Sequence, residues 1–337
     1  MAAKSRPIPS PMQIYADQWA AWRTSALAAA VELDIFTAID EGKRTADAVA
    51  SRAGANASTV RRLLDVLVAM KYLARGGEQY ELSPAARTFL SRKSDLFMEG
   101  IDQVVRMLST SWQQLAQAVR DGHPAVQGGA SRGEFFAVLV KSIFPQSYAA
   151  GKIAARGMAP QTRKRIRNVL DVGGGAASWS ISIAQDLPGA RVTLVDLPQV
   201  VPVARQYTER YGVADRFDYR EGDFREVDFG AEQFDLVVLG HIIHGEGAEW
   251  GKRLIARCAA ALRSKGMLLI AELIPNDART GPAIPMLFDL NMMLHTPAGA
   301  TFTMREYREW LKEAGFGALK IIKSAALPSP LILATKP

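Results

Sequence analysis

Three glycines in the segment VLDVGGGAASWS (169–180) could bring the backbone close to a bound cofactor. Gly173 and Gly175 have no Cβ, so a ligand can approach their peptide groups closely. Asp196 ends the next β-rich run, TLVD, where its carboxylate can accept hydrogen bonds from both hydroxyls of a ribose. These residues predict a site for an adenosine-bearing cofactor, and NAD and S-adenosylmethionine (SAM) fit them equally well.

The glycine spacing and a nearby carboxylate favour SAM over NAD. The pattern is G-x-G-x-A, ending at Ala177, whereas the dinucleotide fingerprint G-x-G-x-x-G needs a glycine where Ser178 stands. Asp171 is expected at the mouth of the first strand. There it would repel a pyrophosphate but attract the ammonium and sulfonium groups of SAM.

A third detail is the segment REGDF (220–224), which ends a predicted third strand. Asp223 can accept a hydrogen bond from the amino group of adenine, and Phe224 can lie against the face of the adenine ring. The two residues together predict an adenine-binding loop.

Two histidines could serve a methyl transfer, which mainly needs proximity and alignment, plus a base when the acceptor is a hydroxyl. His241 and His244 follow the predicted fourth strand, and Glu272 ends the next one. The carboxyl ends of adjacent parallel strands lie side by side, so Glu272 is expected near the histidines. A metal site built from His241, His244, Glu246 and Glu272 is an alternative. No third histidine or cysteine follows at a ligand spacing, so we expect no metal.

Short β-rich runs alternate with helical segments from residue 168 onward. NVLDV, ARVTLVD, FDLVVLG and GMLLIAEL are typical of strands, and the segments between them have helical periodicity. This alternation predicts βαβ units and a parallel sheet. We therefore expect an α/β fold with a Rossmann-like sheet that has helices on both faces.

The first hundred residues instead combine helices with one small hairpin. Thr45 and Gly54 are typical of the start and end of a short helix, and a stronger helical segment, NASTVRRLLDVLVAMKYL, follows. The next segment alternates around Gly76 and Gly77, a two-glycine hairpin signal. Helices followed by a hairpin predict a winged helix-turn-helix. We expect a winged-helix domain at 1–108 and a cofactor domain with substrate-lining helices at 109–337.

The composition is that of a globular protein with a modest positive charge. The chain has 337 residues, a formal net charge of +7 and one cysteine, Cys258, which excludes an internal disulfide. The N-terminal residues contain no apolar core of signal-peptide length, and no run of about 18 apolar residues predicts a membrane span. We expect a cytoplasmic protein without a membrane partner.

The motifs LDVGGG, VDLP, EGDF, LIAELI and REYREWLKEAGF occur in this order along the chain. In them the sequence resembles the class I SAM-dependent O-methyltransferase family with an N-terminal winged-helix dimerisation domain. That family includes plant caffeic acid O-methyltransferases and bacterial antibiotic and pigment methyltransferases. The resemblance implies a small-molecule acceptor, His244 as the catalytic base and Glu272 as the residue that orients its imidazole. It also implies that SAM is the only cofactor and that no metal is needed.

Several positions depart from the family pattern. Ala177 stands where the family has glycine, and Gly245-Glu246 replaces the Asp-Trp that follows the base in plant members. Thr301 occupies the place of a second glutamate that flanks the base in plant members. The loss of one of the two acids argues against the strict plant mechanism and its phenolic acceptor. A hydroxyl remains the first choice of acceptor, with S- or C-methylation, or a non-methylating hydroxylase relative, left open. We expect His241 in the pocket wall.

The acceptor pocket is expected between two apolar segments, EFFAVLVKSIFPQSY (134–148) and PMLFDLNMMLHTP (285–297). Phe288, Met292 and Met293 are the candidates for shaping it, since methionine adapts to irregular ligands.

A DNA-binding regulator that senses a ligand is the rival class. The start of its recognition helix would offer Asn56, Ser58, Thr59, Arg61 and Arg62. The rest of that helix is nearly all apolar, and the wing carries Glu78 and Glu81 against Arg75. In the preceding helix, Tyr15, Trp19 and Trp22 form an aromatic face too large for a lone small domain to bury. We therefore expect an intertwined homodimer through residues 1–110 and no specific nucleic-acid partner.

Overall fold

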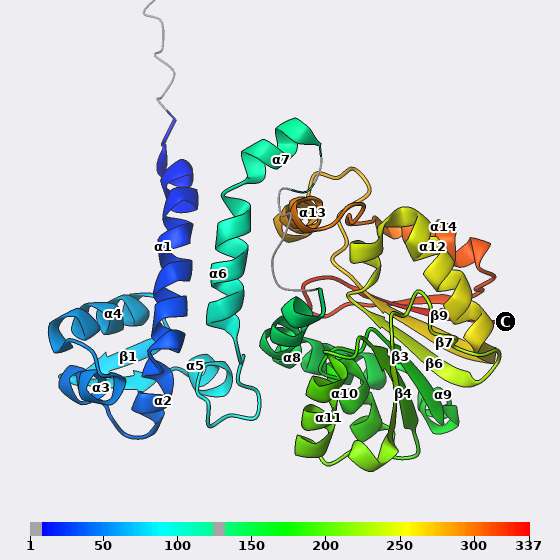
Figure 1. The fold of residues 1–337 in the computed structure, drawn as a ribbon, viewed down its shortest axis with the longest axis horizontal. Coiled ribbons are helices and arrows are strands. Elements are labelled where there is room, and N and C mark those ends of the chain that lie inside the picture. The colour runs from blue at the N-terminus through cyan, green and yellow to red at the C-terminus, as the bar shows by residue number, and fades with distance from the viewer. Residues whose placement is uncertain (1–8, 123, 125–131) are drawn as a thin grey trace, which may run out of the picture. The chain divides into compact units, whose positions relative to one another are not determined.

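The computed structural model describes residues 9–122, 124 and 132–337 (Figure 1). Their contacts divide the chain into two compact units, with the break between Leu108 and Ser109. One buried apolar cluster lies in the N-terminal unit and another in the C-terminal unit. None of the helices in the described part of the chain is both long and apolar enough to cross a membrane.

The N-terminal unit is mainly helical and contains one antiparallel hairpin. Its elements are α1 (Met12–Glu32), α2 (Ile35–Asp40), α3 (Ala46–Ala53), α4 (Ala57–Ala69), β1 (Leu73–Gly76), β2 (Gln79–Leu82) and α5 (Pro84–Phe89), while α6 (Ile101–Trp112) runs across the break. The hydroxyl of Thr45 accepts a hydrogen bond from the backbone N–H of Ala48 at 3.3 Å and so caps α3. Gly54 ends that helix in the left-handed conformation, as its sequence predicts.

The hairpin turn lies one residue later than the glycine pair suggests. Gly76 is opposite Gln79 in the ladder, so Gly77 and Glu78 form the two-residue turn. Gly77 has φ of +60°, a value that glycine adopts without a steric penalty. The hydroxyl of the fully buried Tyr80 donates to Asp65 at 2.8 Å and ties the hairpin to α4.

One arginine of the candidate recognition helix, Arg61, and one of the hairpin, Arg75, are paired with acids. Arg61 lies 2.8 Å from Glu78 in the turn of the hairpin, and Arg75 lies 3.0 Å from Asp65. Partly exposed pairs of this kind contribute little stability, but they offset the positive charge that phosphate binding needs. The DNA-binding alternative loses support here.

The C-terminal unit contains the sheet and the helices around it. Its elements are α7 (Leu115–Asp121), α8 (Arg132–Gly157), α9 (Pro160–Arg165), β3 (Asn168–Val172), α10 (Ser178–Asp186), β4 (Arg191–Asp196), α11 (Val201–Arg210), the 3₁₀ helix η1 (Ala214–Arg216), β5 (Phe217–Glu221), β6 (Phe234–Gly240), α12 (Ile243–Ala261), β7 (Leu262–Ala271), α13 (Ala283–His295), α14 (Met304–Glu313), β8 (Leu319–Ile322) and β9 (Leu331–Thr335).

The sheet has seven strands in the order β5-β4-β3-β6-β7-β9-β8. The five strands from β3 to β7 pair in parallel, and β9 pairs antiparallel with both β7 and β8. Helices α10 and α11 lie on one side of the sheet and α12 and α14 on the other (Figure 1). The predicted α/β fold with helices on both faces is confirmed. Because the strand order reverses between β3 and β6, a ligand crevice is expected at the carboxyl ends of these strands.

Candidate functional site

One pocket of the C-terminal unit lies at the carboxyl ends of β3, β4, β6 and β7. It is lined by Phe136, Leu139, Val140, Ile143, Gln146 and Ser147 of α8, and by Gly173, Gly174, Gly175, Ala176, Ser178, Trp179, Asp196, Leu197, Asp223, Phe224, Gly240, His241, Ile242, His244, Gly245, Glu246, Leu273 and Phe288. Most of the predicted site residues therefore meet in one place. Glu272 and Asp171 are buried behind its wall, at 2% and 1% exposure.

The glycine loop after β3 passes where side chains would not fit. A Cβ on Gly173 would lie 2.5 Å from a methyl of Ile242, and a Cβ on Gly175 would lie 2.9 Å from Val140. Both glycines have φ near +60°. The backbone N–H of Gly175 donates to a carboxylate oxygen of Asp196 at 2.7 Å. Asp196 thus holds the loop and also borders the pocket.

Ala177 takes the left-handed conformation that glycine usually takes. Its φ is +58°, and it is the N-cap of α10 with its methyl fully buried. The departure from the family pattern is accommodated at the cost of a strained backbone. The pocket lining continues on either side of it with Ala176 and Ser178.

The position of Asp171 differs from the sequence-based expectation. It lies within β3 and is not among the residues that line the pocket. Its carboxylate accepts a hydrogen bond from the hydroxyl of Ser180 in α10 and lies close beneath Gly174. Burial raises the pKa of Asp171 to about 7. Asp171 therefore supports the glycine loop from inside the protein and does not face the pocket mouth.

The predicted adenine loop follows β5, and hydrogen bonds from Arg257 of α12 to its backbone hold it in place. The guanidinium of Arg257 donates to the carbonyls of Phe224 at 2.6 Å and Val227 at 2.5 Å, and it lies over the ring of Phe229. Asp223 accepts from the backbone N–H of Arg225 at 2.9 Å, which closes a tight turn. Arg257 is a support that sequence reasoning missed, because no local signal links a helix residue to a loop about thirty positions earlier.

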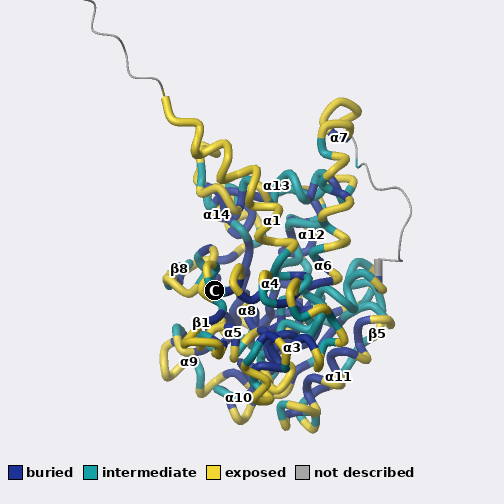
Figure 2. The backbone as a smooth tube through the Cα atoms, turned by 90° about the vertical axis from the view of Figure 1, so that its left-hand side faces the viewer, coloured by how far each residue is buried: buried dark blue, intermediate teal, exposed yellow. Residues whose placement is uncertain are grey.

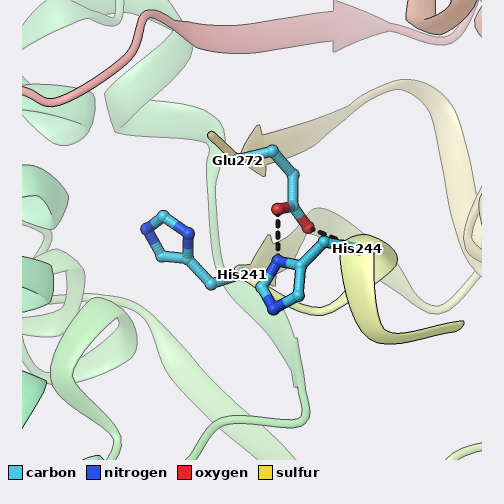
Figure 3. A group of neighbouring side chains, drawn as sticks. All are labelled: His241, His244 and Glu272. Carbon is cyan, nitrogen blue, oxygen red and sulfur yellow. Dashed lines mark hydrogen bonds and ion pairs between the residues drawn. The ribbon is translucent and has the colours of Figure 1, made fainter. Parts of the chain in front are cut away.

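His244 and Glu272 meet as the parallel strands predict. Nδ1 of His244 lies 2.6 Å from Oε2 of Glu272 (Figure 3). Oε1 of Glu272 accepts from the backbone N–H of Ile243 at 2.7 Å. Burial by itself raises the pKa of Glu272, but the charge and hydrogen bond of His244 outweigh it, so this pKa is below its ordinary value. Phe288 of α13 packs edge-on against the imidazole, with ring centres 4.8 Å apart.

His241 is a second imidazole on the same turn, between β6 and α12 (Figure 3). Its ring centre lies 6.2 Å from that of His244 and 6.2 Å from that of Trp179. Burial lowers the pKa of His241 to about 4, so the ring is neutral at pH 7. His241 lines the pocket, which agrees with its expected place in the pocket wall.

Three of the four residues weighed as metal ligands lie together. One donor atom each of His241, His244 and Glu272 falls within 4.8 Å of the others, the one such group found in the described part of the chain. His244 and Glu272 already bond to each other through Nδ1 and Oε2, 2.6 Å apart. The fourth candidate, Glu246, is buried and bonds to Arg225 at 2.7 Å instead.

The place of the second plant glutamate is taken by a polar network. Thr301 is 2% exposed, and its backbone N–H and hydroxyl both donate to Asp289, at 2.6 and 3.0 Å. Arg279 bridges the pair by donating to the carbonyl of Thr301 and to Asp289. Glu272 is thus the one acid that touches the imidazole of His244 among the described residues. Of the three apolar residues expected to shape the acceptor pocket, Phe288 lines it and Met292 and Met293 do not.

This fold and this pocket define a class I methyltransferase, and the pocket residues fit SAM. A Cβ on Gly173 or Gly175 would clash with neighbouring side chains, so the backbone of this loop stays open to a ligand. The same pocket is lined by Asp196, by the pair Asp223 and Phe224, and by His244. The comparisons with known proteins agree. An O-methyltransferase domain model matches residues 112–317, and an O-methyltransferase dimerisation domain model matches residues 19–92. The chain belongs to the SAM-dependent O-methyltransferase family, which acts on small molecules.

Relatives from distant organisms match along nearly the whole chain. The 3-hydroxy-5-methyl-1-naphthoate 3-O-methyltransferase of Streptomyces sahachiroi is 29% identical over 309 residues, which are 90% of this chain and 89% of the relative. Human acetylserotonin O-methyltransferase is 29% identical over 325 residues, 89% of this chain and 91% of the relative. The solved structure of PigF with SAH has a TM-score of 0.78 at 26% identity and covers 98% of this chain and all of PigF. The chain is thus a methyltransferase, and SAM is its cofactor.

Proposed function

We propose that this enzyme methylates a hydroxyl of a small aromatic molecule and that His244 removes the proton of that hydroxyl. The observation that carries the proposal is the 2.6 Å contact between Nδ1 of His244 and the buried carboxylate of Glu272. SAM supplies the methyl group as a good electrophile. The acceptor oxygen must be deprotonated as it attacks, and His244 is the group in the pocket suited to accept the proton.

The carboxylate of Glu272 determines which nitrogen of His244 acts. An ionised carboxylate can only accept hydrogen bonds, so Nδ1 of His244 carries the proton and Nε2 keeps the lone pair. A proton taken up at Nε2 turns the ring into an imidazolium beside the negative charge of Glu272. That charge stabilises the imidazolium, while the hydrogen bond keeps the ring oriented.

The proposed cofactor residues are Gly173, Gly175, Asp196, Asp223 and Phe224. In this proposal the glycines admit the cofactor close to the backbone, Asp196 binds the ribose, and Asp223 and Phe224 bind the adenine. The support is their convergence in one pocket with His244. Asp171 contributes through the loop that it supports.

An aromatic hydroxyl is favoured as the acceptor by the pocket walls and by the relatives. Leu139, Ile143 and Phe288 line the same pocket as the histidines and offer apolar surface there. The names of the naphthoate and acetylserotonin enzymes describe O-methylation. An aromatic thiol is more acidic than the corresponding phenol, so a thiol acceptor would depend less on the pairing of His244 with Glu272.

Incubation with SAM and a set of planar acceptors tests this function. We expect 2-naphthol to gain one methyl group as an ether, detected by mass spectrometry and located by NMR. Naphthalene-2-thiol serves as the matched thiol control, since its shape is the same and its acidity is higher. Methylation of the thiol or of a ring carbon, with no ether formed from any phenol tested, would contradict the proposal.

We also propose a homodimer formed through residues 1–110, in which the N-terminal unit supplies the contacts and residues 109–337 supply the catalytic pocket. The support is the apolar face of α1, where Tyr15, Trp19 and Trp22 stack on one another at 5.5 and 6.2 Å and are 44%, 39% and 65% exposed. The N-terminal half of α1 is exposed along its length (Figure 2). A continuous apolar face of this kind is typical of a self-complementary interface.

Charge placed on this face tests the dimer. The double substitution Trp19→Lys and Trp22→Lys should give a monomer in light scattering at micromolar concentration, because burying unpaired ammonium groups is costly. Thr24→Lys is the control: Thr24 lies on the opposite side of α1 by the 100° helical step, and it should leave the mass unchanged. A wild-type protein that is monomeric under the same conditions would refute the dimer.

A further inference from the structure

His241 is built into the pocket wall in a strained backbone conformation. Its φ is +63°, a region that residues with a Cβ rarely adopt. Its backbone N–H donates to the carbonyl of Ala271 at 2.8 Å, which prolongs the pairing of β6 with β7. This bond fixes the position of the His241 backbone. Strain held in place by surrounding structure is common at ligand-binding positions.

The ring nitrogens of His241 have no hydrogen-bond partner among the described residues. The carboxylate oxygens of the nearby Glu272 are taken by His244 and by the backbone of Ile243. The ring of His241 lies beside the rings of Trp179 and His244. A polar ring that faces a cavity and bonds to nothing around it is available to a ligand.

The chemistry of this ring limits what it can bind. A neutral imidazole offers one N–H donor and one nitrogen acceptor. It is therefore suited to bind a hydroxyl or a carbonyl oxygen of the ligand, and a charged ligand group is not needed. Because His241 is neutral at pH 7, it also does not compete with His244 for the charge of Glu272.

The ring centres of His241 and His244 lie 6.2 Å apart, which permits a pair of neighbouring oxygens to bridge the two rings. A ring nitrogen of His241 and one of His244 lie within 4.8 Å of each other. Oxygens on adjacent ring carbons are separated by roughly 2.7 Å, and each hydrogen bond to nitrogen adds about 2.8 Å. Two such oxygens can therefore each reach a different imidazole.

We infer that His241 is a substrate-positioning residue that binds a second oxygen next to the hydroxyl that is methylated. The preferred acceptors are then planar aromatic molecules with a vicinal or peri oxygen pair, such as a catechol-type diol or an ortho-hydroxy ketone. This inference rests on the proposed function, in which His244 faces the reacting hydroxyl. It adds that His241 selects which hydroxyl of a polyoxygenated ring is presented.

Binding of two matched probes to the SAH-loaded enzyme tests the assignment. Calorimetry should show that the wild type binds naphthalene-2,3-diol roughly three- to tenfold more tightly than 2-naphthol, after correction for the two equivalent hydroxyls of the diol. His241→Ala should bring this ratio close to one. His241→Asn should keep part of it, because asparagine tolerates the left-handed conformation and retains a donor and an acceptor.

The histidine His295 provides the control. Its two ring nitrogens are taken by Asn291 and Ser111, and it does not line the pocket, so His295→Asn should leave the ratio unchanged. Equal affinity of the wild type for both probes, binding of neither, or a preference that survives in His241→Ala would overturn the inference. Failure of the wild type to methylate any phenol would instead overturn the proposed function, and the binding ratio is measured independently of turnover.

Discussion

His244→Ala is expected to lower kcat by two orders of magnitude or more and to leave the affinity for SAM nearly unchanged. The substitution removes the group that takes up the proton, and general-base catalysis typically contributes 10²–10⁴-fold. Cofactor affinity is spared because Asp196, proposed to bind the ribose, ends β4, and Asp223 and Phe224, proposed to bind the adenine, follow β5, whereas His244 lies in the first turn of α12. Steady-state kinetics with a phenolic acceptor and calorimetry with SAH measure the two quantities.

A matched variant separates lost chemistry from lost structure. In His244→Ala the carboxylate of Glu272 stays buried and keeps only backbone donors, which costs stability. The double variant His244→Ala with Glu272→Gln removes that charge, so it should recover melting temperature without recovering kcat. Full turnover in His244→Ala would show that deprotonation does not occur there and that the acceptor is already ionised at neutral pH.

Asp196→Ala is expected to weaken the binding of SAM by about 1–3 kcal/mol, or roughly 5- to 150-fold. Two effects act together, because the variant loses the proposed contacts to the ribose hydroxyls and the 2.7 Å bond that holds Gly175 in place. Titration calorimetry with SAM measures the loss.

The neighbouring strand offers a control for charge alone. Asp218 is an exposed carboxylate in β5, directly beside β4, and its ion pair with Arg191 is 4.0 Å long. Asp218→Ala should leave the affinity for SAM unchanged. Binding of NAD by the wild type without binding of SAM, or unaltered SAM affinity in Asp196→Ala, would contradict the assignment of the pocket.

Much of the fold follows from patterns that are local in the sequence. The β-rich runs from residue 168 onward predict the parallel strands β3 to β7, because each run is bounded by its own turn or helix signals. The caps at Thr45 and Gly54 act on the backbone within a few residues and are visible in the same way. The strands β8 and β9 escaped prediction, since β9 pairs antiparallel with β7, which lies about sixty residues earlier in the chain, and β8 joins the sheet only through β9.

Part of the candidate site could likewise be predicted from the sequence, and part is visible only in the structure. Glycines, strand-end carboxylates and two histidines could be recognised from residue type and position, because parallel strands bring their carboxyl ends to one edge. Only the tertiary structure decided the direction of each side chain. It turned Asp171 inward to Ser180, set Thr301 in a hydrogen-bond network with Asp289, and bonded Arg257 to the predicted adenine loop. Side-chain direction depends on packing against residues distant in the chain, so no local pattern carries that information.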